Sequence, residues 1–249
     1  MIDYIKNANL PEHDVDTVIV SGTDKSLLNK LTEQGINYIL SYKNTSIIDN
    51  LAEHTDLSVY HKGDNQFIMD ASQYYLAEKL TDADIVIPSE PIKSPYPGDC
   101  RLNAADIGDY IICNKKITDK KIIDFAHDNH KTIIDVGQGY SNCSVCVAGR
   151  NIILTEDQSI LKCVIRIPDI KVLMLPKGSI KLHGYDYGFI GGACTLIGKS
   201  HLLINGDLSK HSAYEQIIDF LNANDIIYTD IKGKDIVDIG GIIPIKERY

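Results

Sequence analysis

The fold is decided by the stretch Val145-Cys-Val-Ala-Gly-Arg-Asn-Ile-Ile-Leu154. Its pattern of two apolar runs joined by a glycine turn recurs along the chain. Glycine adopts at no steric cost the positive φ that a tight hairpin turn requires. Four hairpins of this kind are predicted, and their turn glycines are Gly63, Gly108, Gly149 and Gly198. They are spaced by roughly 45 residues, which is typical of a repeat fold.

Each hairpin is followed by a segment with helical periodicity and then by a third apolar run. After Asp207, the apolar residues Tyr214, Ile217, Ile218 and Leu221 recur at the spacing of one helical face. The third strands of the four units are predicted at residues 84–87, 132–136, 171–175 and 226–230. The repeating unit is therefore strand–strand–helix–strand.

The two ends of the chain supply the parts of a fifth unit. Residues 235–245 look like its first strand, and residues 17–20, 24–33 and 38–41 look like its second strand, helix and third strand. We therefore expect one α/β domain over residues 1–249, a five-fold pseudo-symmetric α/β-propeller whose fifth unit is completed by both termini. Closing the ring would protect sheet edges that an open array would expose.

Composition and charge exclude several classes of protein. The formal net charge is −9 and no basic stripe is present, so we expect no nucleic-acid partner. No stretch approaches the roughly 18 apolar residues of a membrane span, and no secretory signal is found, so we expect no membrane partner. The 6 cysteines have no framework spacing, which indicates reduced thiols in a cytoplasm. The oligomeric state stays open.

Four phrases give the sequence a resemblance to a known fold. They are His54-Thr-Asp-Leu57, Tyr96-Pro-Gly-Asp-Cys-Arg-Leu-Asn103, Gln138-Gly-Tyr-Ser-Asn-Cys143 and Gly184-Tyr-Asp-Tyr-Gly-Phe-Ile-Gly-Gly192. With the five expected units, they resemble the guanidino-modifying-enzyme (pentein, α/β-propeller) superfamily and, within it, an uncharacterised bacterial family. Arginine deiminases, dimethylarginine dimethylaminohydrolases, amidinotransferases and a non-catalytic ribosome anti-association factor share that fold. The resemblance spans nearly the whole chain and implies a site in a central channel.

The sequence departs from the enzymes of that superfamily at two positions. In those enzymes a cysteine shortly after a Gly-Gly pair near the C-terminus attacks the guanidinium carbon. Here the matching stretch, Gly240-Gly-Ile-Ile-Pro244, contains no cysteine. The histidine that opens the first strand of the fourth unit is matched here by Phe189. The resemblance therefore implies the fold without the usual covalent mechanism.

The loops that lead into the first strands carry polar residues that would converge on the channel. For catalysis the candidates are Cys143 as nucleophile and His54 as acid or base. For substrate binding they are Asp56, Asp99, Asn103 and Asp186. The alternative interpretation is that these Asp and Asn residues cap turns and that Cys143 is a small buried hydrophobic residue.

No metal ion or other cofactor is expected from the sequence. Cys143-Ser-Val-Cys146 has CxxC spacing, but residues three apart on a strand point to opposite faces, and no second CxxC exists.

Two functional interpretations remain. The first is a protein that binds a small ligand, guanidino or amino-acid-like, in the channel without the usual Cys/His catalysis. The second is a hydrolase or amidinotransferase acting on a guanidino C–N bond with Cys143 as a displaced nucleophile. A protein-interaction scaffold is a third alternative, which a large exposed apolar patch would favour.

Overall fold

The computed structural model describes all residues from Met1 to Tyr249 and contains five separate small sheets. Four of the sheets have three strands, of which the first two are antiparallel and the last two parallel. Their strands are β4 (Val59–Gly63), β5 (Gln66–Met69) and β6 (Asp84–Val86); β7 (Ala105–Asp106), β8 (Tyr110–Cys113) and β9 (Thr132–Asp135); β10 (Val145–Gly149), β11 (Ile152–Thr155) and β12 (Lys171–Met174); and β13 (Cys194–Gly198), β14 (His201–Ile204) and β15 (Ile227–Thr229). The four predicted hairpins and the strand that follows each of them are confirmed.

The fifth sheet contains both ends of the chain. Its strand order is β1 (Ile2–Tyr4), β16 (Ile242–Arg248), β2 (Asp14–Val20) and β3 (Asn37–Leu40). The prediction that the two termini share one unit is therefore confirmed. The predicted strand over residues 235–245 begins and ends too early: β16 starts only after Gly240 and Gly241, whose positive φ interrupts the extended backbone, and it continues to Arg248. The edge strand β1 was not predicted.

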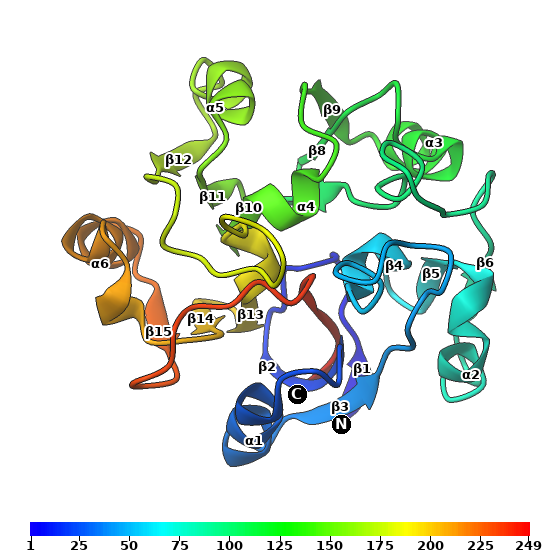
Figure 1. Cartoon of the computed structure of the whole chain (residues 1–249), viewed down its shortest axis with the longest axis horizontal. Helices are drawn as coiled ribbons and strands as arrows, with labels where there is room; N and C mark the ends of the chain where they lie inside the picture. Colours follow the sequence, from blue (N-terminus) through cyan, green and yellow to red (C-terminus); the bar gives the residue numbers. More distant parts are fainter.

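The helices lie at the outside of the ring of sheets, whereas the first strands of the sheets face its centre (Figure 1). The longer helices are α1 (Lys25–Glu33), α3 (Lys120–Asp128), α5 (Gln158–Val164) and α6 (Tyr214–Asn222), and the short ones are α2 (Tyr74–Ala77) and α4 (Ser141–Ser144). None of the helices has the length and apolar character needed to cross a membrane. Three helices begin at an aspartate whose carboxylate accepts backbone N–H groups of the first turn, as N-caps do: Asp24, Asp119 and Asp157.

Apolar side chains are buried between the sheets and their helices, in several clusters. In α6, for example, Ile217 and Leu221 are buried on the face that the sequence predicted. The inner ends of the first strands instead bury polar side chains, which include Asp56, Asn103 and Asp238. The apolar packing therefore lies around the centre of the ring, and the centre itself is polar.

The stability of the protein should be sensitive to substitutions in β16. Ile245 in β16 is 0% exposed, and its side chain packs with residues of β4 and β5 in one apolar cluster. We expect Ile245→Ala to lower the free energy of unfolding by about 2–5 kcal/mol, because the lost methyl groups leave a cavity. Urea denaturation measures this value.

The matched control is Ile2→Ala in the edge strand β1, where the isoleucine is 54% exposed. We expect a change within about 0.5 kcal/mol there. Equal effects of the two substitutions would contradict a central role for β16.

Candidate functional site

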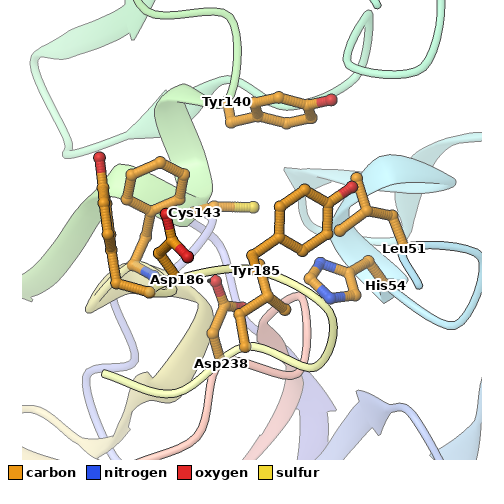
Figure 2. Close-up of a pocket in the computed structure, with 10 residues that line it drawn as sticks. Leu51, His54, Tyr140, Cys143, Tyr185, Asp186 and Asp238 are labelled. Carbon is orange, nitrogen blue, oxygen red and sulfur yellow. Dashed lines mark hydrogen bonds between the residues drawn. The ribbon is translucent and has the colours of Figure 1, made fainter. Parts of the chain in front are cut away.

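A cavity of about 290 Å³ lies at the centre of the ring (Figure 2). Every residue that lines it precedes the first strand of a sheet: Leu51 and His54 before β4; Tyr140 and Cys143 before β10; Leu182, Tyr185, Asp186, Tyr187 and Phe189 before β13; and Asp238 before β16. Of the four loops that the sequence selected, those before β4, β10 and β13 line the cavity and the one before β7 does not, whereas the segment before β16 lines it and was not selected.

Cys143 lies on the short helix α4, and Asn103 from the loop before β7 fixes its position. The Asn103 side chain accepts a hydrogen bond from the Cys143 backbone N–H (3.1 Å), and its Nδ2 donates to Sγ (3.2 Å). The thiol in turn donates to Oδ2 of Asp56 (3.0 Å), which also accepts from Nδ2 of Asn142 (3.0 Å). These contacts hold a protonated thiol against a carboxylate in a buried position.

His54 and Asp56 are held by the 3-10 turn η1 (Thr55–Leu57) and by the chain segment just before β16. The Asp56 backbone N–H donates to the carbonyl of Gly240 (2.9 Å). Gly240 has a φ of +75°, and a Cβ placed there would lie 2.2 Å from Cβ of His54. Only glycine therefore fits at position 240, and the close approach of the Gly240-Gly241 pair holds His54 and Asp56 in position.

The polar atoms of this group are not all satisfied. Nδ1 of His54 and Oδ1 of Asp56 are buried and have no hydrogen-bond partner. Burial lowers the pKa of His54, and burial raises the pKa of Asp56. Burial and the nearby Asp56 carboxylate raise the pKa of Cys143 well above its ordinary value. The imidazole is therefore neutral and the thiol protonated at neutral pH.

Two further carboxyl groups are buried: Asp238 lines the cavity, and Glu156 lies close enough to Asp238 for their charges to interact. Asp238 accepts hydrogen bonds from the backbone N–H groups of Phe189 (3.0 Å) and Gly240 (2.9 Å), and burial raises its pKa to about 6. Glu156 accepts one from the backbone N–H of Ile190 (3.1 Å), its Oε1 has no partner, and burial raises its pKa to about 7.

None of these central carboxyl groups is paired with a basic side chain. Asp56, Asp238 and Glu156 form no salt bridge with an N···O distance of 4.0 Å or less. By contrast, the equally buried Asp106 is paired with Lys131 at 2.7 Å. The centre of the ring therefore carries acidic groups without an internal cation, which is an unusual arrangement for buried charges.

The residues that the sequence suggested as site residues lie in three places. His54, Cys143 and Asp186 line the cavity. Asp56 and Asn103 lie directly behind Cys143 and contact its sulfur. Asp99 does not line the cavity; its carboxylate accepts a hydrogen bond from the hydroxyl of Tyr140 (3.2 Å), and Tyr140 is the residue that lines it. The proposed roles of all six residues stay predictions.

Sequence reasoning missed several residues of the site. Asp238 and Glu156 were not selected, although Asp238 stands two residues before the Gly240-Gly241 pair that was compared with the enzymes. Tyr185, Tyr187 and Phe189 also line the cavity, whereas the sequence predicts only Asp186 of this segment as a site residue. The helical turn α4 was also missed, so Cys143 and Cys146 are not on one strand as assumed: Cys143 faces the cavity from α4, and Cys146 packs in an apolar cluster from β10.

The site also contains one set of side chains that could hold a metal ion. His54, Asp56 and Cys143 each offer a ligand atom, and these atoms all lie within 4.8 Å of one another. All three side chains are buried.

Solved structures of similar fold include several guanidino-modifying enzymes. An amidinotransferase of the saxitoxin biosynthetic pathway from Microseira wollei has 10% identity and a TM-score of 0.60, over 98% of each chain. The inosamine-phosphate amidinotransferase from Streptomyces griseus has 11% identity and a TM-score of 0.60, over 99% of this chain and 98% of that one. An agmatine deiminase from C. jejuni has 11% identity and a TM-score of 0.56, over 98% and 96%. The chain therefore has the α/β fold of the pentein superfamily.

Sequence comparison points to a family without an assigned activity. A family model described as "Family of unknown function (DUF6873)" matches residues 18–243, which is most of the chain. No curated protein matches the sequence. At the low identities of the structural relatives, similarity shows the fold alone, and the function has to be argued from the site.

The buried carboxyl group of Glu156 should make stability depend on pH. Its pKa rises from 4.5 to about 7 on folding, so the folded state binds more protons between these values, and stability is lost as the pH rises through about 7. We expect Glu156→Gln, which keeps the acceptor for the Ile190 N–H, to lack this loss. The variant should gain roughly 3 kcal/mol relative to the unmodified protein between pH 4.5 and pH 8.

Urea denaturation at several pH values measures this difference. The control is Glu215→Gln, at an exposed position on α6, which should leave the pH dependence unchanged. A Glu156→Gln variant with the pH profile of the unmodified protein would show that the carboxyl group titrates normally.

Proposed function

Since this chain belongs to the family of unknown function DUF6873 and has the fold of guanidino-modifying enzymes, we propose that it binds a small organic cation of the guanidinium or amidinium class in the central cavity. The observation that carries the proposal is the lining of this cavity. It combines the aromatic rings of Tyr140, Tyr185, Tyr187 and Phe189 with the carboxylates of Asp186 and Asp238, and it includes no lysine or arginine.

This lining matches the chemistry of an organic cation. Aromatic faces attract a cation by about 0.5–2 kcal/mol each, the more so where water is excluded. Carboxylates accept the paired N–H groups of a guanidinium in a planar, bidentate arrangement. In the view of Figure 2, Asp186 is drawn next to Cys143, Asp238 below them and the ring of Tyr140 above them. An anionic ligand would be repelled by the same groups.

A neighbouring cation does not neutralise the cavity. Lys177 donates to the hydroxyl of Tyr187 (3.1 Å), and its Nζ lies 5.2 Å from the centroid of that ring, but Lys177 does not line the cavity. The contact shows that the Tyr187 ring already accommodates a cation at one position. A bound guanidinium would use the rings that line the cavity in the same way.

The wider predictions about the molecule fit this proposal. We propose that the five sheets are repeats of one unit, related by five-fold pseudo-symmetry around the cavity, within a single domain. We also place the protein in the cytoplasm, because its 6 cysteines are all free. A small-molecule ligand is the partner that this arrangement supports.

Binding should depend on the positive charge of the ligand. We expect n-butylguanidinium to bind and to raise the melting temperature, whereas n-butylurea, which has nearly the same shape and no charge, should bind much more weakly. Asp238→Asn should weaken binding of the cation by at least about 30-fold, because one partner of a buried charge pair is lost. Asp186→Asn, at an exposed position, should weaken it a few-fold.

Isothermal titration calorimetry on the chelator-treated protein measures these affinities. Asp219→Asn, an exposed aspartate on α6, is the control and should bind as the unmodified protein does. Equal binding of the urea and the guanidinium would contradict the proposal, and so would full affinity in a folded Asp238→Asn variant.

A second candidate function is amidinohydrolase or amidinotransferase activity with Cys143 as the nucleophile. The observation that favours it is that Sγ of Cys143 lines the cavity, next to His54, and already donates its proton to Asp56 at 3.0 Å. A cation bound in the cavity would stabilise the thiolate and lower the pKa of the thiol. The resting thiol would then become reactive only when a substrate is present.

The chemical steps use residues that are in place. Sγ attacks the amidino carbon while the thiol proton passes to Asp56, and the S–C bond forms. The C–N bond then breaks, and the leaving amine takes up the proton held by Asp56. His54, neutral at this stage, removes a proton from water or from a second amine, which attacks the S–C carbon. The S–C bond breaks, and the proton passes from His54 to Sγ, which restores the thiol. Water gives a hydrolase and an amine gives an amidinotransferase.

Incubation with agmatine, arginine and dimethylarginine tests this activity. We expect release of ammonia or amine and a covalent adduct on Cys143 in acid-quenched samples, detected by mass spectrometry of peptides. Cys143→Ser should reduce product formation by about a thousandfold or more. Cys194→Ser, a buried cysteine that does not line the main cavity, should have no such effect. Undiminished turnover in Cys143→Ser would exclude this candidate.

A further inference from the structure

We propose that His54, Asp56 and Cys143 form a binding site for a divalent transition metal of the zinc type, with one coordination position open to the central cavity. The inference goes beyond organic-cation binding, because it concerns the inner wall of the cavity and a different ligand. It rests on geometry, on two unpartnered buried atoms and on the chemistry of the three ligands.

The three ligand atoms already lie close enough to share one ion. They come from two segments far apart in the sequence, yet they are all within 4.8 Å of one another. Zinc ligands lie about 2.0–2.3 Å from the metal, so two ligands on one ion are separated by roughly 3.5 Å. Movements of less than about 1 Å would therefore bring the imidazole, the carboxylate and the sulfur into coordination distance.

Two buried atoms in this group lack any partner in the protein. They are Nδ1 of His54 and Oδ1 of Asp56, and both side chains are more than nine-tenths buried. A buried polar atom without a hydrogen bond costs about 1–3 kcal/mol, so such atoms are normally satisfied. Imidazole nitrogens and carboxylate oxygens are both metal ligands, so two of the three side chains carry a ligand atom that no group of the protein occupies.

The remaining contacts of the ligands resemble an outer shell that fixes their orientation. Nδ2 of Asn142 donates to the carboxylate of Asp56 (3.0 Å), and Nδ2 of Asn103 donates to the sulfur of Cys143 (3.2 Å). Metal-binding side chains are commonly oriented by such hydrogen bonds. The Gly240 carbonyl accepts from the Asp56 N–H (2.9 Å) and keeps the aspartate beside the histidine.

The ligand types select the kind of metal. A thiolate and an imidazole favour zinc and similar transition metals over magnesium or calcium, which prefer oxygen ligands. Three protein ligands with one open position are typical of zinc sites at which water or a substrate is the fourth ligand. Here His54 and Cys143 both line the cavity, so the open position would face it.

Binding of the ion releases one proton. The Sγ–H bond of Cys143 breaks, the proton goes to solvent, and a sulfur–metal bond forms without any change of oxidation state. The charges of the thiolate and of Asp56 are then balanced by the ion, while Asp186 and Asp238 stay available for an organic cation. A metal-bound Cys143 could not act as the covalent nucleophile, so the two roles of this thiol exclude each other.

Cobalt(II) is a suitable probe, because a thiolate ligand gives it a charge-transfer absorption band. Bound metal is removed from the full-length protein with a chelator, and the protein is then titrated with Co²⁺. The bound metal is measured by inductively coupled plasma mass spectrometry. We expect one Co²⁺ per chain, the charge-transfer band, and release of about one proton per ion. Zn²⁺ should displace Co²⁺ and should protect Cys143 from iodoacetamide in the unmodified protein.

Three variants test the sulfur ligand, its orienting residue and a cysteine outside the site. Cys143→Ser should abolish the band, and Asn103→Ala should weaken metal binding by about 10–100-fold. Cys194→Ser is the matched control and should retain both the band and the affinity, because Cys194 is a buried cysteine outside this group. The proposal is wrong if the stripped protein binds no Co²⁺ at stoichiometric concentration, if the band survives in Cys143→Ser, or if Zn²⁺ leaves the alkylation of Cys143 unchanged.

These outcomes are independent of the proposed binding of an organic cation. Butylguanidinium is titrated into the chelator-treated protein, so its binding does not require the metal. A protein that binds butylguanidinium and no Co²⁺ would refute the metal site alone, and one that binds Co²⁺ and no butylguanidinium would refute the organic-cation proposal alone.

Discussion

The pairing of β16 with β1 on one side and with β2 on the other is the interaction on which the site depends. It joins the two ends of the chain in one sheet, and the backbone of Met1 exchanges hydrogen bonds with that of Tyr249. The same pairing places the segment before β16 at the centre of the ring, where Gly240 seats His54 and Asp56 and where Asp238 lines the cavity. The pairing of the two chain ends therefore also positions residues of the candidate site.

The distribution of polar and apolar groups follows from this arrangement. Apolar side chains fill the space between each sheet and its helix, so the inner ends of the first strands are left for polar groups. Buried carboxylates of the protein have partners of two kinds: a basic side chain, as Lys131 for Asp106, or backbone N–H groups, as those of residues 12 and 13 for Glu247. Asp238 and Glu156 have partners of the second kind only, and burial keeps the Cys143 thiol and the Glu156 carboxyl group protonated to higher pH than usual.

The fold is shared with guanidino-modifying enzymes, but the candidate site residues of this chain stand at other positions than the catalytic residues expected from that resemblance. At the two positions where those enzymes are expected to carry histidine and cysteine, this chain has Phe189, whose ring lines the cavity, and Pro244, which lies in β16. Histidine, aspartate and cysteine instead come from the loops before β4 and β10. The arrangement of the sheets permits this, because the segments before β4, β10, β13 and β16 all line the same cavity.

The sequence by itself determined the repeating unit, its four hairpins and the contribution of both termini to a fifth unit, because turn glycines and apolar periodicity are local signals. It also singled out His54, Asp56, Asn103 and Cys143, which come together in the structure. Only the tertiary structure decided that Asp99 lies behind Tyr140, that Asp238 and Glu156 belong to the centre, and that Cys143 sits on a helical turn. The physical reason is that burial and the partners of a charge are properties of the packed ring: whether a carboxylate meets a lysine, an N–H group or nothing depends on units far apart in the chain.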